Sequence, residues 1–291
     1  MDHYLITLLS IGGIYLLLAQ ALNFQYGFAG LANFGVVGFY AIGAYTSALL
    51  SMAGWPVPVS VLVGGLAGVL ASLLLGRICL RLRADYLGIV TLSFSEIVRT
   101  FLIGHESLTN GPRGIANVPA LPLPWSSAAN FLTVIILANL LVAVGIYLWV
   151  RSPFGRSVQA MRDDEAAFSA IAKSALSYKM RVLGLGGGIM AIAGALYAHY
   201  IGYISPDQFI PLTTFYVWIA VIVGGAGRLS GALAGTLLLT LFLEGSRFLR
   251  DVLPWISEVE MASIRLAAIG LALMIMTVWR PQGLMGNYTS K

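Results

Sequence analysis

Long apolar segments recur along the whole of this 291-residue chain, and they restrict its fold more than any other feature. Each is about 20 residues long, the length that a helix needs to cross the hydrocarbon core of a bilayer. Because 58% of the residues are hydrophobic and 10% are charged, a water-soluble domain with a polar surface is excluded. The sequence predicts an all-α polytopic membrane protein, a bundle of about eight to ten transmembrane helices forming a single domain over residues 1–291. The predicted segments are 4–22, 34–53, 57–80, 86–104, 128–150, 182–203, 213–223, 231–249 and 263–279.

The basic residues predict which ends of these segments face the cytoplasm. Arg77, Arg81 and Arg83 follow one segment, a charged stretch at 151–180 follows another, and Arg280 and Lys291 lie close to the end of the chain. By the positive-inside rule these parts are cytoplasmic, and the loops at 105–127 and 204–211 lie outside.

The side of the N-terminus stays open, because no Lys or Arg precedes Arg77. It is external if the stretch from Phe24 to Tyr45 crosses the membrane once, and internal if the start of that stretch is re-entrant. The first segment has no basic region before it and no cleavage motif after it, so we interpret it as a true span.

Two glycine-rich breaks interrupt the hydrophobic sequence, one near the start and one at 221–238. Backbone groups released from a helix are tolerated in a membrane only where they line a cavity or are buried in protein. Paired breaks in two halves of a chain are typical of a transport pathway. The alternative is close helix packing, as expected for the Gly-x-x-x-Gly pairs that begin at Gly64, Gly184 and Gly231. We assign to a substrate pathway Gly27, Gly30, Asn33, Gly35, Gly224, Gly225 and Gly227.

Two Phe-x-Glu-x-x-Arg sequences place opposite charges three residues apart, Glu96 with Arg99 and Glu244 with Arg247. This spacing puts each pair on one helix face, where the charges neutralise each other. Charges within a bilayer are costly and usually face the interior of the bundle. We add Glu96 and Arg99 to the substrate pathway, with a purely structural ion pair as the alternative, and interpret the second pair as a helix end.

Residues 151–180 carry too many charges to cross a membrane and form a predicted cytoplasmic loop. Within it, residues 162–174 fit a short amphipathic helix, with Asp163, Asp164 and Glu165 in the first turn and Lys173 in the last. Ala167, Phe168 and Ile171 form its apolar stripe. Mixed acids and bases favour docking into a protein groove over binding to lipid. A helix that only caps the bundle is the alternative.

Several kinds of chemistry are missing from the sequence. It contains no Walker A, His-Glu-x-x-His or Gly-x-Ser-x-Gly motif, and its histidines do not have metal-ligand spacing. The Lys and Arg residues lie in separate loops, which does not suit nucleic acid. We therefore expect a chain that is not an enzyme and binds no metal, cofactor or nucleotide of its own.

Taken together, several stretches resemble a known family, the permease subunits of ABC importers for branched-chain amino acids. The matching stretches are "YGFAGLANFGVVGFYAIGAYTSALL" (26–50), "LRLRADYLGIVTLSFSEIVR" (80–99), "TNGPRGI" (109–115), "SPFGRSVQAMRDDEAA" (152–167), "GALYAHYIGYISPDQF" (194–209), "VGGAGRLSGALAG" (223–235) and "WRPQGLMG" (279–286). They occur in the family's order and cover most of the chain.

This resemblance implies the ABC importer permease fold in a bacterial inner membrane. It implies four kinds of partner: a related, non-identical second permease, two cytoplasmic ATPases that bind ATP and Mg, a periplasmic or lipid-anchored solute-binding protein, and a small-molecule substrate. The substrate would pass along the interface between the permeases. The ATPase-coupling helix would include Arg156, Arg162, Asp163, Asp164, Glu165, Ala166, Ala167 and Phe168.

The sequence departs from the family pattern in two places. Most relatives begin with a further hydrophobic segment, and the coupling region usually continues with Ala-Leu-Gly-Ile where this chain reads "SAIAKSALSYK". Two other functions stay open: a permease for urea or short amides, and an ion-coupled secondary transporter. The second needs ion ligands inside the membrane, and Glu96 is almost the only candidate acid away from the helix ends.

Overall fold

The computed structural model describes residues 2–80, 84–121, 128–170 and 174–252, with scattered residues between 263 and 285. The predicted all-α fold is confirmed. In the described part, six helices are long and apolar enough to cross a membrane, and two more apolar helices are shorter. The helices are α1 (Asp2–Gln25), α2 (Val36–Met52), α3 (Val57–Cys79), α4 (Ala84–Gly104), α5 (Glu106–Thr109), α6 (Ala128–Arg151), α7 (Pro153–Asp163), α8 (Glu165–Ala170), α9 (Ala175–Ile201), α10 (Pro211–Gly224) and α11 (Leu229–Val252).

Most predicted segments agree with these helices, but two differ. α9 begins at Ala175, earlier than the predicted 182, because the helix continues past the apolar stretch through Lys179 and Arg181. The predicted segment at 263–279 lies mostly outside the described residues.

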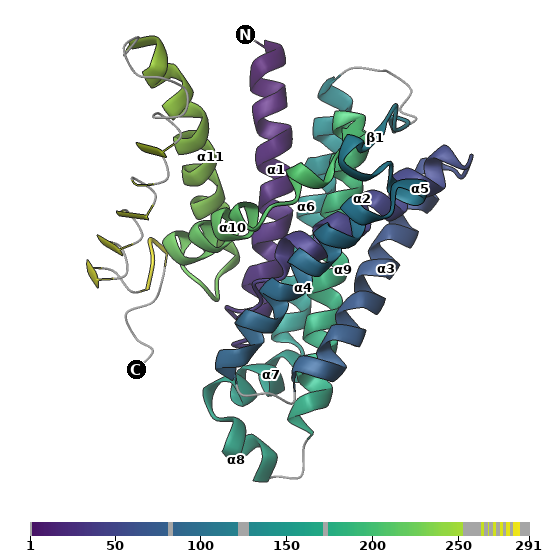
Figure 1. Cartoon of the computed structure of the whole chain (residues 1–291). Helices are drawn as coiled ribbons and strands as arrows, with labels where there is room; N and C mark the ends of the chain where they lie inside the picture. Colours follow the sequence, from purple (N-terminus) through teal and green to yellow (C-terminus); the bar gives the residue numbers. More distant parts are fainter. Residues whose placement is uncertain are drawn as a thin grey trace.

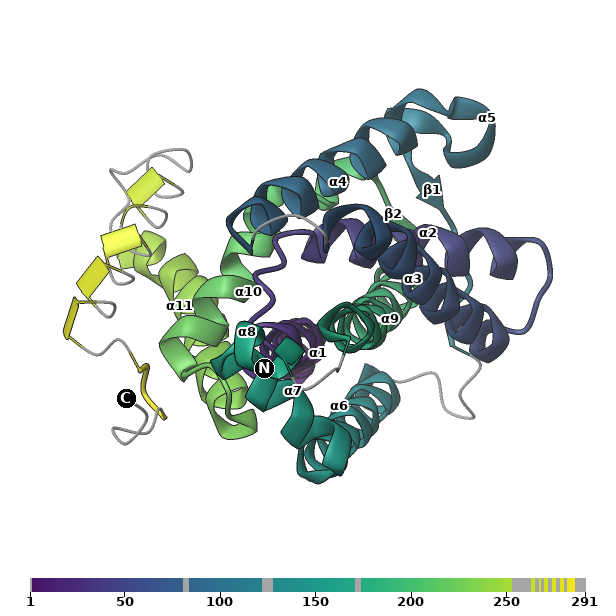
Figure 2. The same ribbon diagram turned by 90° about the horizontal axis from the view of Figure 1, so that it is seen from below.

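α1 and α9 lie side by side at the centre of the bundle (Figure 2). α2 and α3 pack on α9, whereas α6, α10 and α11 pack on α1. α4 packs on α2 at the periphery and leads into α5. Figure 1 shows α7 and α8 beyond one end of the bundle, with α5 and the N-terminus at the opposite end.

This arrangement bears on the side of the N-terminus, which the charges left open. α1 runs toward the end where α7 lies, the chain turns at residues 26–35, and α2 runs back (Figure 1). With the α7 end on the cytoplasmic side, as the basic residues predict, the start of α1 is external.

Small residues hold α3 against α9. A methyl group at Gly68 would lie 2.7 Å from the carbonyl oxygen of Gly187, and one at Gly188 would lie 2.7 Å from Cγ2 of Val69. On α11, a methyl group at Gly231 would lie 3.0 Å from the Gly224 carbonyl oxygen. The packing interpretation of the Gly-x-x-x-Gly pairs is therefore correct.

A short cap connects the loops at the end opposite α7. It consists of the 3₁₀ turns Gly111–Arg113 and Pro206–Gln208 and a two-residue antiparallel ladder of β1 (Ile115–Ala116) with β2 (Tyr203–Ile204). Buried His199 attaches the loop at Pro119 to α9 and α2. Its Nδ1 lies 2.6 Å from the carbonyl oxygen of Pro119, and its Nε2 lies 2.8 Å from Oγ of Ser47. A carbonyl only accepts, so Nδ1 carries the proton and Nε2 accepts from the serine hydroxyl.

We predict that Gly68→Ala lowers the thermal unfolding midpoint of the detergent-purified protein. The added methyl group meets backbone atoms of α9, and overpacking of this kind costs about 1 to 3 kcal/mol. Gly145→Ala on α6 is the matched control, because nothing lies within 4 Å of its added methyl group. Equal midpoints for the two variants would show that α3 and α9 are not closely packed.

Candidate functional site

The first break, residues 26–35, is held together by buried amide side chains. Asn33 Nδ2 donates to Oε1 of Gln25 at 2.7 Å, and Gln25 Nε2 donates to the carbonyl oxygen of Leu183 on α9 at 3.0 Å. Asn33 Oδ1 also accepts from the backbone N–H of Gly35 at 2.7 Å. The bond to Gly35 satisfies a backbone group that the break releases, and the other two tie the break to α9, as a membrane interior requires.

Neighbouring helices provide acceptors for N–H groups at the start of α2, although the Gly38 N–H also donates to the Gly35 carbonyl oxygen at 3.1 Å. Gly38 N–H donates to Oγ of Ser95 on α4 at 3.2 Å, and Val37 N–H donates to Oγ1 of Thr214 on α10 at 3.2 Å. Phe34 N–H donates to Oγ1 of Thr91 at 2.9 Å, just before the helix begins. The break is therefore fixed to α4 and α10, because a helix start must have its N–H groups satisfied.

The second break, between α10 and α11, lies against the first. Gly225 and Gly227 have φ of 110° and 85°, which side chains rarely adopt. Asn23, at the end of α1, joins the breaks: its Oδ1 accepts from Gly227 N–H at 2.8 Å and its Nδ2 donates to the Arg228 carbonyl oxygen at 2.9 Å. Gly27 and Gly227 touch through their backbones, leaving no room for a side chain. We call this contact between residues 23–35 and 224–228 the break junction.

The structure thus places the predicted pathway glycines in one region, but it packs several of them into protein. Asn33, Gly35, Gly224 and Gly225 are buried, whereas Gly30 is exposed and Gly227 is half-buried. Trp218 covers Asn33, donating from Nε1 to its carbonyl oxygen at 3.0 Å. The sequence was compatible with two roles for these residues, helix packing and the lining of a substrate pathway. Within this single chain, the buried residues pack against protein.

The segment predicted to couple to an ATPase forms two helices instead of one. α7 begins after Ser152, whose Oγ accepts from Gly155 N–H at 3.1 Å, and it ends at Asp163. Asp164 is extended, with φ −151° and ψ 100°, and its Oδ1 accepts from Ala167 N–H at 2.9 Å. The predicted helix over 162–174 is therefore wrong at its N-terminal end. Asp164 separates α7 from α8, because its side chain makes the capping bond that begins α8. The predicted positions Ile171 and Lys173 lie outside the described residues.

Several predicted coupling residues already bind within the chain. Phe168 is buried against the Tyr178 ring at 5.3 Å between centroids, so it is not available to a partner. Glu165 accepts from Lys179 Nζ at 2.6 Å, which attaches α8 to α9. Apart from Phe168, all the predicted coupling residues are exposed: Arg156, Arg162, Asp163, Asp164, Glu165, Ala166 and Ala167.

Arg162 points toward the membrane part and reaches the first break. Its NH1 donates to the Gly27 carbonyl oxygen at 2.6 Å, while its Nε and NH2 contact Oδ1 of Asp163 at 3.1 and 3.0 Å. This places Arg162 in the break junction as well as in the coupling segment.

Glu96 and Arg99 form the predicted ion pair on one face of α4. Arg99 NH1 lies 3.4 Å from Oε2 of Glu96, and its NH2 lies 3.6 Å from Oδ1 of Asp207 in the cap. Sequence spacing could not reveal Asp207, which is far along the chain. Both contacts are longer than an ideal charged hydrogen bond, and Glu96 Oε1 and Arg99 Nε have no partner among the described residues. In the second pair, Glu244 accepts from the Tyr4 hydroxyl at 2.9 Å, and the side chain of Arg247 lies outside the described residues.

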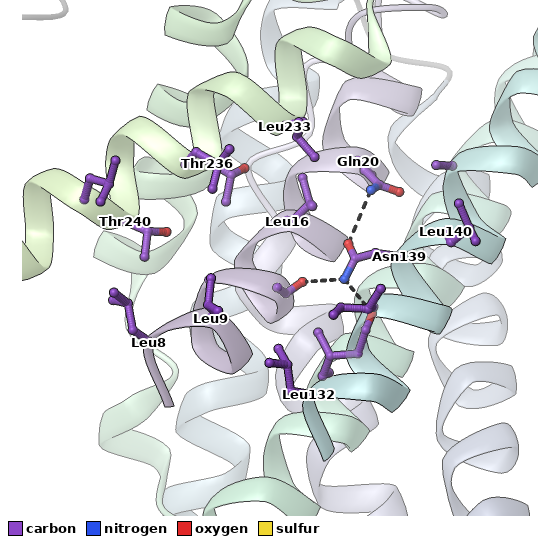
Figure 3. A pocket seen from close by; sticks show the side chains of 17 residues that line it. Leu8, Leu9, Leu16, Gln20, Leu132, Asn139, Leu140, Leu233, Thr236 and Thr240 are labelled. Atoms are coloured by element: carbon purple, nitrogen blue, oxygen red, sulfur yellow. Dashed lines mark hydrogen bonds between the residues drawn. The ribbon is translucent and has the colours of Figure 1, made fainter. Parts of the chain in front are cut away.

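A cavity of about 400 Å³ lies between α1, α6 and α11, away from the break junction (Figure 3). Its few polar groups include Gln20, which donates to Oδ1 of Asn139 at 3.3 Å, and Asn139, which donates to the Gly13 carbonyl oxygen at 2.9 Å. Its residues are otherwise mainly leucine, isoleucine, glycine and alanine, and none of them is charged. Such a lining does not suit a zwitterionic solute.

Sequence reasoning missed the side chains that hold the junction, chiefly Asn23, Gln25 and Trp218. One signal was available: Gln20, Asn23, Gln25 and Asn33 are amides within or beside an apolar segment. Amides at such positions are costly in lipid, so they indicate contacts within the bundle.

Helices that cross a membrane and two discontinuous segments joined at their breaks define a polytopic membrane transport protein. The sequence matches the family described as "Branched-chain amino acid transport system / permease component" over residues 4–278. The chain belongs to this permease family.

Individual relatives agree with the family match. The chain is 32% identical to the high-affinity branched-chain amino acid transport system permease protein LivM of Escherichia coli K12, over 94% of this chain and 68% of the relative. It is 29% identical to a probable LivM permease of Methanocaldococcus jannaschii, over 77% of this chain and 76% of the relative. It is also 26% identical to LivH of Escherichia coli K12, over 79% of this chain and 80% of that relative. No solved structure matches the chain.

We predict that Asn23→Ala destabilises the protein by about 2 to 4 kcal/mol, because it leaves the Gly227 N–H and the Arg228 carbonyl without their buried partner. The measurement is thermal or denaturant unfolding in detergent. Ser93→Ala on α4 is the control, since Ser93 is exposed and bonds only to its own helix at Ile89. A loss for Asn23→Ala no larger than for the control would mean that the junction contributes nothing to stability.

We predict that Glu96→Gln lowers the unfolding midpoint more than Glu106→Gln does. The first change leaves the Arg99 charge with a weaker set of partners, at a cost of about 0.5 to 1 kcal/mol, whereas Glu106 is exposed. Scanning calorimetry of both purified variants measures the difference. Identical midpoints would show that the contacts of Glu96 contribute no more to stability than those of the exposed Glu106.

Proposed function

We propose that this chain is the transmembrane permease subunit of an ATP-driven ABC importer that moves branched-chain amino acids into the cytoplasm. The observation that carries the proposal is the family match over residues 4–278. The relatives LivM and LivH are named as permease proteins of high-affinity branched-chain amino acid transport systems.

The geometry supports a subunit driven by another protein. α7 and α8 extend beyond the bundle (Figure 1). Ala166 and Ala167 of α8 are exposed, while Glu165 and Phe168 of the same helix attach it to α9. A small, rigidly held surface of this kind suits docking into a groove of a cytoplasmic ATPase. Because the chain lacks a Walker A motif, the proposal assigns ATP and Mg to that partner.

The other proposed partners follow from the relatives. LivM and LivH are different permease proteins with the same system name, so we propose a related, non-identical second permease beside this chain. A solute-binding protein would deliver substrate at the cap of β1 and β2. The proposed location is the inner membrane of a bacterial cell, and the proposed path follows the interface between permeases, near Gly30 and Gly227.

Uptake into vesicles tests this function. We predict that vesicles containing this chain, its second permease, the ATPases and the binding protein take up labelled leucine only when ATP is present. ATPases defective in hydrolysis are the control, and labelled urea separates the urea permease alternative. Leucine uptake that follows an ion gradient without ATPases would instead identify a secondary transporter.

A further inference from the structure

We propose that Arg162 is the residue that transmits movement of the coupling helices to both breaks, acting as a positioning residue that stays partly exposed at the end of α7. This proposal rests on the proposed function. It differs from the sequence-based expectation that Arg162 faces an ATPase.

Arg162 contacts the first break at two points. Its guanidinium donates to the Gly27 carbonyl oxygen at 2.6 Å, and its Cγ lies 2.9 Å from where a methyl group at Gly30 would be. Gly30 has φ of 70°, so glycine both permits the turn and leaves room for the arginine stem. The first break therefore accommodates this side chain in addition to the amide contacts that hold it.

The second break lies within reach of the same guanidinium. A methyl group at Gly227 would lie 3.9 Å from Arg162 NH1, and Gly27 touches the backbone nitrogen of Gly227. Asn23 then joins both sides of this contact, through Gly227 and Arg228. A displacement of Arg162 thus acts directly on the first break and, through Gly27 and Asn23, on the second.

The direction of the guanidinium is set from α7. Asp163 holds Nε and NH2 at 3.1 and 3.0 Å, which leaves NH1 for Gly27. Charge-assisted bonds of this kind are stronger and more directional than neutral ones. The Gly27 carbonyl, released from its helix, also depends on this donor.

The test uses the complete transporter in vesicles, with leucine uptake and ATP hydrolysis measured on the same preparation. For Arg162→Ala we expect the ATPases to copurify and hydrolysis to stay within about twofold, while leucine moved per ATP falls by about tenfold. Arg162→Lys should recover part of the loss, because lysine can donate to Gly27 but lacks the fork that also binds Asp163. Arg77→Ala, an exposed arginine at the same side of the bundle, is the control and should retain the ratio.

A second measurement follows the junction directly. Ala226, between the glycines of the second break, is exposed, whereas the native Cys79 is buried. A cysteine at position 226 should change its maleimide labelling rate when ATP is added, and Arg162→Ala should abolish that change. The proposal is overturned if the ratio of leucine to ATP is unchanged, if the ATP-dependent labelling persists, or if Arg162→Ala releases the ATPases.

The variants keep the two proposals separate. If the Arg162→Ala permease does not fold and cannot be purified at all, Arg162→Lys decides: a wild-type ratio overturns the inference, and a reduced ratio with intact hydrolysis supports it. Absence of ATP-dependent leucine uptake in the unmodified transporter would contradict the proposed function. Normal uptake by the unmodified transporter, together with an unchanged ratio of leucine to ATP in the Arg162 variants, would contradict only this inference.

Discussion

The structure depends on one constraint of the bilayer: a backbone group that leaves a helix must find a partner in protein. Two segments of this chain leave their helices, and the side chains of Asn23, Asn33 and Thr91 bond to backbone groups that are released. The breaks are therefore ordered contacts between helices rather than loose connections. This requirement explains why amides and hydroxyls occur inside otherwise apolar sequence.

Much of the fold could be predicted because hydropathy is a local property. An apolar stretch of membrane length indicates a span wherever it packs, and glycine clusters mark the ends of α1 and α10. The contacts of the site are not local. The bond from Asn23 to Gly227 joins residues 204 positions apart, and that from Arg162 to Gly27 joins residues 135 apart. Neither segment, taken alone, contains a sequence pattern that identifies the residue it contacts.

The coupling segment shows the same limit in another form. Its charges correctly set it outside the bundle, but charge alone could not distinguish side chains that face a partner from those that face the chain itself. Glu165 and Phe168 are used within the protein, and Asp164 begins a helix. The sequence resemblance assigned all of them to one surface, because a sequence motif does not show the direction in which each side chain points.

The two ends of the bundle are held by different kinds of contact. The ladder of β1 with β2 and the His199 contacts fasten the loops at one end to α9 and α2, whereas at the other end the two breaks meet each other and Arg162. Loops thus connect the helices at the cap, whereas at the α7 end the interrupted segments are bonded directly to each other. A displacement of α7 therefore meets the break junction before it meets the cap.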